Sequence, residues 1–181
     1  MPASRPGVSP DDVCGHNRGM RAWVVAAGLI EGPDGLVLVQ NRRRDGSLDW
    51  SPPGGVIEIH DGESITDGLT REVREETGLL VEAWDGPVYD VEVVAERLGW
   101  TLRAETFVAR EWSGAIEIDD PDGIVVDAEF VAVSEWQSRL TGSHPWVREP
   151  IEAWLSGPPT LTSYRYRLDG PAGSVEVVRL H

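Results

Sequence analysis

The chain is poor in cysteine and in long apolar runs. Cys14 is the only cysteine among the 181 residues, so an intramolecular disulfide cannot form. A single thiol fits a reducing compartment. The apolar run from Trp23 to Ile30 is too short to span a bilayer, and the N-terminal residues lack the apolar core of a signal peptide. These absences favour a soluble, cytoplasmic protein.

Positive charge is also scarce. Lysine and arginine total 16 against 31 aspartates and glutamates, which gives a formal net charge of −15 at pH 7. A nucleic-acid-binding surface needs clustered basic side chains, and anionic lipid attracts the same side chains. We therefore expect neither a nucleic-acid partner nor a membrane partner. A small phosphate substrate would have to be met by a local basic patch or through metal ions.

The most informative stretch runs from residue 54 to residue 80 and contains three closely spaced glutamates. On a helix, Glu72, Glu75 and Glu76 lie at positions i, i+3 and i+4, so their carboxylates share one face. Like charges at this spacing destabilise a helix by about 0.2–0.5 kcal/mol per pair. A solvated acidic face is the ordinary explanation for three glutamates alone, whereas a bound divalent cation would explain why this helix accepts the repulsion.

The same stretch has the pattern of an amphipathic helix with defined ends. Ile65, Leu69 and Val73 repeat every four residues and make an apolar stripe that can pack on a sheet. Ser64 occupies the expected N-cap position, and Gly78 stands where a helix needs a left-handed stop.

From Glu63 to Leu79 the sequence resembles the box motif of the Nudix family. That part of the motif reads Glu, seven residues, Arg-Glu-apolar-x-Glu-Glu-x-Gly-apolar, and this chain matches every fixed position and spacing. Upstream, seven residues instead of five separate Gly55 from Glu63. We interpret the difference as a two-residue insertion in the loop around residues 59–61, where added length costs little closure entropy.

The resemblance implies an α/β/α sandwich with a mixed sheet and a magnesium-dependent hydrolase, with Mn²⁺ as an alternative ion. It implies that the three box glutamates bind the metal or activate water, and that the Gly55 carbonyl is a further ligand. Glu63 and Arg71 are expected to form an ion pair that holds the loop on the helix. Family members often add an acid from a later loop, and the residues leave the choice open between Asp127 and Glu129 as first candidates and Asp120 and Asp122 as reserves.

A run of three arginines precedes the box by about ten residues. It is either a solvated strand end or a patch for substrate phosphates, because arginine presents a planar fork of donors to phosphate oxygens. Strand alternation would point Arg42 and Arg44 to one face and Arg43 away. Trp50 follows, with core packing as one role and stacking on a substrate base as the other.

The remaining sequence predicts one α/β domain with additions at both ends. Residues 1–20 are expected to form a loose arm, residues 21–156 the Nudix-like catalytic domain, and residues 157–181 a tether and a β-hairpin. Strands expected at Arg21–Leu29 and Leu36–Gln40 are separated by a turn signal, so we expect them to pair as a hairpin. Ser134 is expected to cap a short helix, and a second helix is expected at residues 145–155.

The C-terminal hairpin has apolar side chains to bury, because two lone strands are marginal by themselves. It either packs on the catalytic domain or bridges the subunits of a homodimer, and the sequence leaves both open. For the whole chain, the sequence predicts hydrolysis of a pyrophosphate bond in a nucleoside diphosphate linked to another moiety, or in a nucleoside triphosphate. The alternative is a binding or sensor module of the same fold without turnover. The presence of all three box glutamates favours the enzyme.

Overall fold

Two β-sheets and three α-helices make up the computed structural model, which describes residues 20–59, 62–157, 162–171 and 174–180. Residues 1–19 of the arm expected at residues 1–20, with Cys14 among them, lie outside the described residues. None of the helices in the described ranges is long and apolar enough to cross a bilayer.

The larger sheet has six strands in the order β10-β9-β6-β7-β1-β5. Their bounds are Arg21–Leu29 for β1, Gly54–Val56 for β5, Leu80–Ala95 for β6, Trp100–Ser113 for β7, Ser163–Asp169 for β9 and Glu176–Leu180 for β10. The sheet is mixed, because β1 runs parallel to β7 and β6 parallel to β9, while the other neighbours are antiparallel.

The smaller sheet is antiparallel and centres on β3 (Gly35–Arg42). This strand pairs with β2 (Glu31–Gly32), β4 (Leu48–Ser51) and β8 (Val125–Val131). The hairpin expected between Arg21–Leu29 and Leu36–Gln40 is therefore wrong. Both edges of β1 are taken by β5 and β7, and the chain crosses into the second sheet at Ile30, whose side chain is fully buried. The turn signal is real, but it joins β3 only to the two-residue strand β2.

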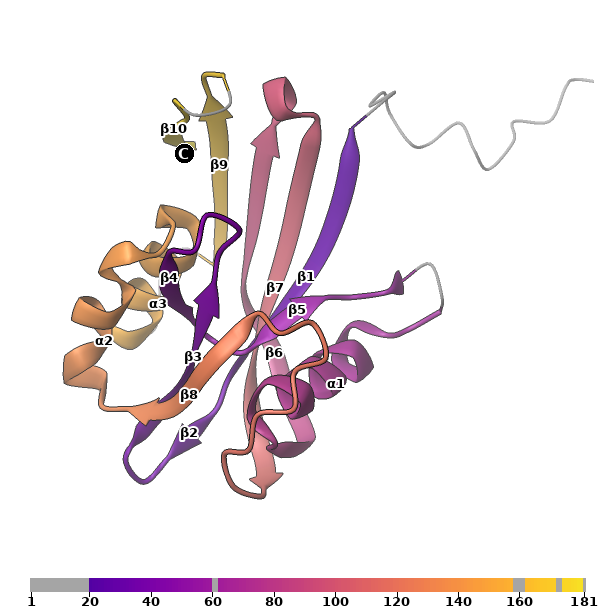
Figure 1. Ribbon diagram of the computed structural model, residues 1–181, viewed down its shortest axis with the longest axis vertical. Coiled ribbons are helices and arrows are strands. Elements are labelled where there is room, and N and C mark those ends of the chain that lie inside the picture. Colours follow the sequence, from indigo (N-terminus) through magenta and orange to yellow (C-terminus); the bar gives the residue numbers. More distant parts are fainter. Residues whose placement is uncertain (1–19, 60–61, 158–161, 172–173, 181) are drawn as a thin grey trace, which may run out of the picture.

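Figure 1 shows α1 (Ile65–Thr77) on one side of the sheets and α2 (Val133–Arg139) with α3 (Pro145–Leu155) on the other. Two groups of buried side chains follow this division. One packs Leu69 and Val73 of α1 on the larger sheet, and the other joins Trp136 of α2 and Ile151 of α3 to strands of both sheets. The predicted α/β/α arrangement with a mixed sheet is confirmed.

The start of α2 differs from the expectation. The N-cap residue is Ala132, without a side-chain hydrogen bond, and Ser134 lies inside the helix. Trp136 explains the earlier start, because its indole is almost completely buried and donates to the Val131 carbonyl at 3.0 Å. Core packing of the tryptophan outweighs a capping bond that contributes about 1 kcal/mol.

The C-terminal hairpin consists of β9 and β10 and packs on the domain of its own chain. β9 aligns with β6 in parallel register, and Tyr164, Tyr166 and Leu168 are buried in the core on the α3 side. Covering these side chains therefore requires no second subunit.

Candidate active site

The box helix α1 has well-defined ends. Ser64 accepts a hydrogen bond from the Asp67 backbone N–H at 3.1 Å, and at the other end Gly78 adopts φ 76° and donates to the Arg74 carbonyl at 2.8 Å. A side chain at Gly78 would be strained at this φ, and its Cβ would also approach the Glu117 carbonyl oxygen to 2.6 Å. The helix α1 therefore ends where the backbone of Glu117, in a later loop, can contact it.

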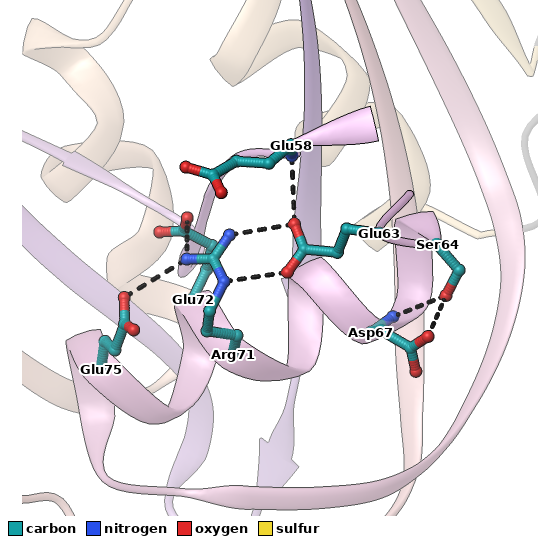
Figure 2. A network of polar contacts seen from close by, with 7 residues as sticks. All are labelled: Glu58, Glu63, Ser64, Asp67, Arg71, Glu72 and Glu75. Carbon is teal, nitrogen blue, oxygen red and sulfur yellow. Dashed lines mark hydrogen bonds and ion pairs between the residues drawn. The ribbon is translucent and has the colours of Figure 1, made fainter. Parts of the chain in front are cut away.

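Arg71 connects the loop before α1 with two of the box carboxylates (Figure 2). Its guanidinium donates to both oxygens of Glu63, at 2.9 and 3.1 Å, and to Glu72 at 2.6 Å, with a longer contact of 3.4 Å to Glu75. Glu63 also accepts the Glu58 backbone N–H at 3.0 Å. These contacts raise the pKa of Arg71 and lower the pKa of Glu63, so both stay charged.

The Gly54–Gly55 turn lies directly against the side chains of two box glutamates. A Cβ on Gly55 would lie 2.4 Å from Oε2 of Glu72. The Gly54 backbone N–H donates to Oε2 of Glu76 at 2.7 Å. Backbone of the turn and two box carboxylates are therefore in direct contact.

Glu72 and Glu76 sit in an environment that disfavours their negative charge. Burial, reinforced by the negative charges of Glu72 and Asp120, raises the pKa of Glu76 from 4.5 to about 8, although the Gly54 N–H opposes the shift. Burial also raises the pKa of Glu72, and the bond from Arg71 opposes that shift. Crowded carboxylates of this kind would be stabilised by a cation.

The donor set fits a hard divalent ion. Carboxylate and carbonyl oxygens are the ligands that Mg²⁺ and Mn²⁺ prefer. Among the described residues, no three His, Cys, Asp or Glu side chains already converge as metal ligands. The contacts explain this, because Arg71 draws Glu72 and Glu75 to itself while Glu76 faces the Gly54 N–H. Binding a cation would require these side chains to exchange partners.

The candidates for a later acid occupy different surroundings. Glu129, on β8, forms an ion pair with Arg139 of α2, and Asp127 accepts a hydrogen bond from the Ala128 backbone N–H at 2.9 Å. The loop before β8 carries Asp120 and Asp122, whose charges act on Glu76 and Glu72 respectively. The charges of the reserve candidates therefore reach the box glutamates.

The loop at residues 114–124 is docked on the C-terminal end of α1. The backbone N–H groups of Glu117 and Asp119 donate to the carbonyls of Thr77 and Glu75, at 2.8 and 2.9 Å. Asp120 in turn accepts three backbone N–H groups of its own loop, from residues 122, 124 and 125. Sequence reasoning missed this docking, for which the pair of acids before Pro121 is the only local signal.

A groove of about 870 Å³ follows the outer flank of α1. It lies between the helix and this loop and is lined by residues that include Arg71, Arg74, Glu75 and Asp119. Charged groups of both signs therefore border the box helix on this side.

The arginine run borders a hollow of about 600 Å³ between the β3–β4 loop and the start of α3. Arg43 and Arg44 line it together with Asp45, Asp49 and His144, whereas Arg42 does not. Arg43 forms an ion pair with Asp49, which is 6% exposed and whose Oδ1 has no hydrogen-bond partner within the described part of the chain. The sequence offered no signal for Asp49 or His144, because their proximity depends on β4 meeting the turn before α3.

Trp50 lies in the core and is 8% exposed. The Arg139 guanidinium covers its ring, 4.8 Å from the ring centre, and Ser143 donates to its backbone carbonyl at 2.5 Å. Stacking of a base on Trp50 stays a prediction and would require Arg139 to move.

A family model described as the NUDIX domain matches residues 20–155, and the chain belongs to this family. The fold and the box helix are accordingly those of a Nudix domain. A solved Nudix hydrolase from Nitrosomonas europaea is 27% identical, with a TM-score of 0.62 over 77% of this chain and 92% of that one. The E. coli ORF135 protein, at 21% identity and a TM-score of 0.63, covers 81% of this chain and shares the fold.

Curated relatives match over smaller parts of their own length. The 8-oxo-dGDP phosphatase NUDT18 of Mus musculus is 32% identical over 95 residues, which are 52% of this chain and 27% of that protein. The polyketide synthase GfsE of Streptomyces halstedii is 25% identical over 165 residues, 89% of this chain but 4% of that protein. This chain therefore spans about a quarter or less of these two relatives.

Proposed function

We propose that the protein is a magnesium-dependent hydrolase, with Mn²⁺ as a substitute ion, that cleaves the pyrophosphate bond of a small nucleotide. The substrate class is a nucleoside diphosphate, free or linked to another moiety, or a nucleoside triphosphate. The observation that carries the proposal is the placement of Glu72 and Glu76 against the Gly54–Gly55 turn, with the charge of Glu76 unfavourably buried and Glu75 on the same helix. The relative NUDT18 is named as a phosphatase of 8-oxo-dGDP, which supports the nucleoside diphosphate class.

In this proposal Glu72, Glu76 and the Gly55 carbonyl hold the metal, and Glu75 completes the set or accepts a proton from the attacking water. When bound, Mg²⁺ neutralises phosphate oxygens and lowers the pKa of a bound water. Arg71 keeps the loop before α1 in place through Glu63. Asp120 and Asp122 supply additional negative charge next to the box, ahead of Asp127 and Glu129.

The part of the substrate that is not hydrolysed is assigned to the hollow beside Arg44. Asp49 in its wall and Gly55 at the turn are six residues apart in the chain, which is at most about 20 Å of extended backbone. Arg44 is exposed and offers its guanidinium to an anionic group. The single cysteine and the negative net charge support a cytoplasmic enzyme that acts on small molecules.

The test is a panel of nucleoside diphosphates, their derivatives and nucleoside triphosphates, incubated with Mg²⁺ and read by release of phosphate or nucleoside monophosphate. We expect turnover that disappears with a chelator and in the E75Q and E76Q variants. A sensor module would instead bind a panel member, seen by calorimetry, without consuming it. Binding without turnover in the parent protein would therefore reject the enzyme in favour of the sensor.

A further inference from the structure

The described residues beyond the family match form part of the same core. The match ends at residue 155, yet β9 extends the larger sheet beside β6, and Tyr166 is completely buried. This segment contacts α3, the helix whose N-cap residue, His144, lines the hollow assigned to the substrate.

Two side chains of the hairpin converge on one carboxylate of α3. The Tyr166 hydroxyl donates to Oε2 of Glu149 at 2.9 Å, and Arg179 donates to the same oxygen at 3.3 Å. The Arg179 guanidinium also lies over the ring of Tyr164, 5.3 Å from its centre. Glu149 is therefore the polar link between β9, β10 and α3.

Pro150 removes one backbone hydrogen bond next to the first turn of α3. A proline inside a helix has no N–H, so Pro150 cannot donate to the carbonyl of Trp146, four residues earlier. The turn from Pro145 to Glu149 is thereby less firmly joined to the rest of the helix. Tertiary contacts must therefore compensate in part for the missing hydrogen bond.

The residue that precedes this first turn lines the hollow. His144, the N-cap residue of α3, lines the hollow and stacks on Trp146, with ring centres 4.0 Å apart and planes inclined by 11°. Glu149 follows His144 by five residues, about 7.5 Å along a helix axis. A displacement of Glu149 would therefore be passed to the His144–Trp146 pair.

We propose that Glu149 is a positioning residue through which the C-terminal hairpin sets the place of His144 in the substrate hollow. The inference rests on the proposed function for the identity of the hollow. The geometry on which it depends, from Tyr166 and Arg179 through Glu149 to His144, is independent of any reaction. A role limited to stability would leave His144 where it is.

The experiment compares the parent protein with a Y166F/R179Q double variant, which removes both donors to Glu149 but keeps the buried ring of residue 166. The ring signals of His144 are followed by NMR and assigned with H144Q. Turnover of the best substrate of the panel is measured in parallel. We expect shifted His144 signals and a KM raised about three- to tenfold, with kcat unchanged within about twofold.

The matched control is R167Q, which removes the Arg167–Asp169 contact of 2.8 Å on the same hairpin without touching α3. We expect its His144 signals and its KM to match the parent. Unchanged His144 signals in the double variant would overturn the proposal, and so would equal shifts in the double variant and in R167Q. If no nucleotide is hydrolysed, the proposed function fails while the NMR comparison still tests the link.

Discussion

At the scale of single residues, the site is a balance between carboxylates that repel one another and the few groups that hold them. Arg71 contacts three of these carboxylates, and Gly54 contributes a backbone N–H to a fourth, Glu76 (Figure 2 shows the contacts of Arg71). Substitutions of these residues should therefore change stability and activity to different extents, and the two measurements together distinguish a structural role from a catalytic one.

The buried charge of Glu76 predicts an unusual pH dependence of the metal-free protein. Its folded pKa of about 8 lies above the ordinary value of 4.5, so the folded state holds the proton more tightly than the unfolded state. The contribution of Glu76 to stability should therefore be greatest below the ordinary value and fall as the pH rises toward about 8. E76Q keeps an acceptor for the Gly54 N–H but has no charge to bury. In the presence of a metal chelator, we expect the melting temperature of E76Q to exceed that of the parent by several degrees near pH 8. Near pH 4.5 the two melting temperatures should match.

Added Mg²⁺ should make the parent melt at a higher temperature than E76Q near pH 8, because only the parent offers the ion its full set of carboxylate ligands. The measurement is thermal unfolding with and without Mg²⁺ at several pH values. An E76Q protein stabilised by Mg²⁺ as strongly as the parent would show that Glu76 is not a ligand.

Removing Arg71 should affect support and activity together. R71A leaves Glu63 and Glu72 without their common partner, and we expect a loss of about 1–2 kcal/mol, discounted for partial exposure, together with reduced turnover. R71K keeps the charge without the bidentate fork, so its stability and its turnover should lie between those of R71A and those of the parent. An R71A variant that melts like the parent but is inactive would indicate that Arg71 acts directly on the phosphate.

The three arginines should differ in the quantity that they change. R44A should raise KM about tenfold, equivalent to about 1.4 kcal/mol, without a change in melting temperature, since Arg44 is exposed at the hollow. The sequence alone predicts little effect for R43A, but the ion pair with buried Asp49 leads us to expect a stability loss of about 2 kcal/mol. R42A serves as the control. Equal small effects on KM at all three positions would show that the three arginines do not bind the substrate.

At the scale of elements, the active site is an assembly of α1 with the two loops that contact it. The Gly54–Gly55 turn approaches one side of the helix, and the loop at residues 114–124 uses the free carbonyls of the helix C-terminal end. The second loop has its own internal support in Asp120, which accepts three backbone N–H groups. The acids of this loop can act on the box only while that support holds.

Loss of Asp120 should therefore weaken metal binding, because it removes the support of the loop and a negative charge next to the box. D120A removes the acceptor of three N–H groups, and we expect a melting temperature lower by a few degrees and a Kd for Mg²⁺ raised about tenfold. Asp119 offers a matched control, because its hydrogen bond to α1 comes from its backbone, so D119A should leave both quantities near those of the parent. Calorimetric titration with Mg²⁺ measures the affinity. Equal affinities of D120A and the parent for Mg²⁺ would show that the loop does not contribute to metal binding.

At the scale of the whole molecule, a net charge of −15 opposes the approach of an anionic nucleotide. Screening of this repulsion predicts that kcat/KM rises with ionic strength when the free Mg²⁺ concentration is held constant. Between about 10 and 150 mM salt the Debye length falls from about 30 to 8 Å, so the salt mainly screens the repulsion between the substrate and distant charges. A fall of kcat/KM over this range would mean that Arg43 and Arg44 dominate the field at the hollow.

The sequence by itself determined the features that depend on local spacing. The position of α1, its caps at Ser64 and Gly78, the shared face of its glutamates and the α/β/α class all follow from periodicity, turn residues and one long motif. Only the tertiary structure decided which strands are neighbours and which distant side chains meet. Arg21–Leu29 pairs with a strand that begins at Trp100, Asp49 meets His144 in one hollow, and Tyr166 reaches Glu149. These contacts join residues far apart in the chain, and burial of the whole core selects them, so no local pattern records them.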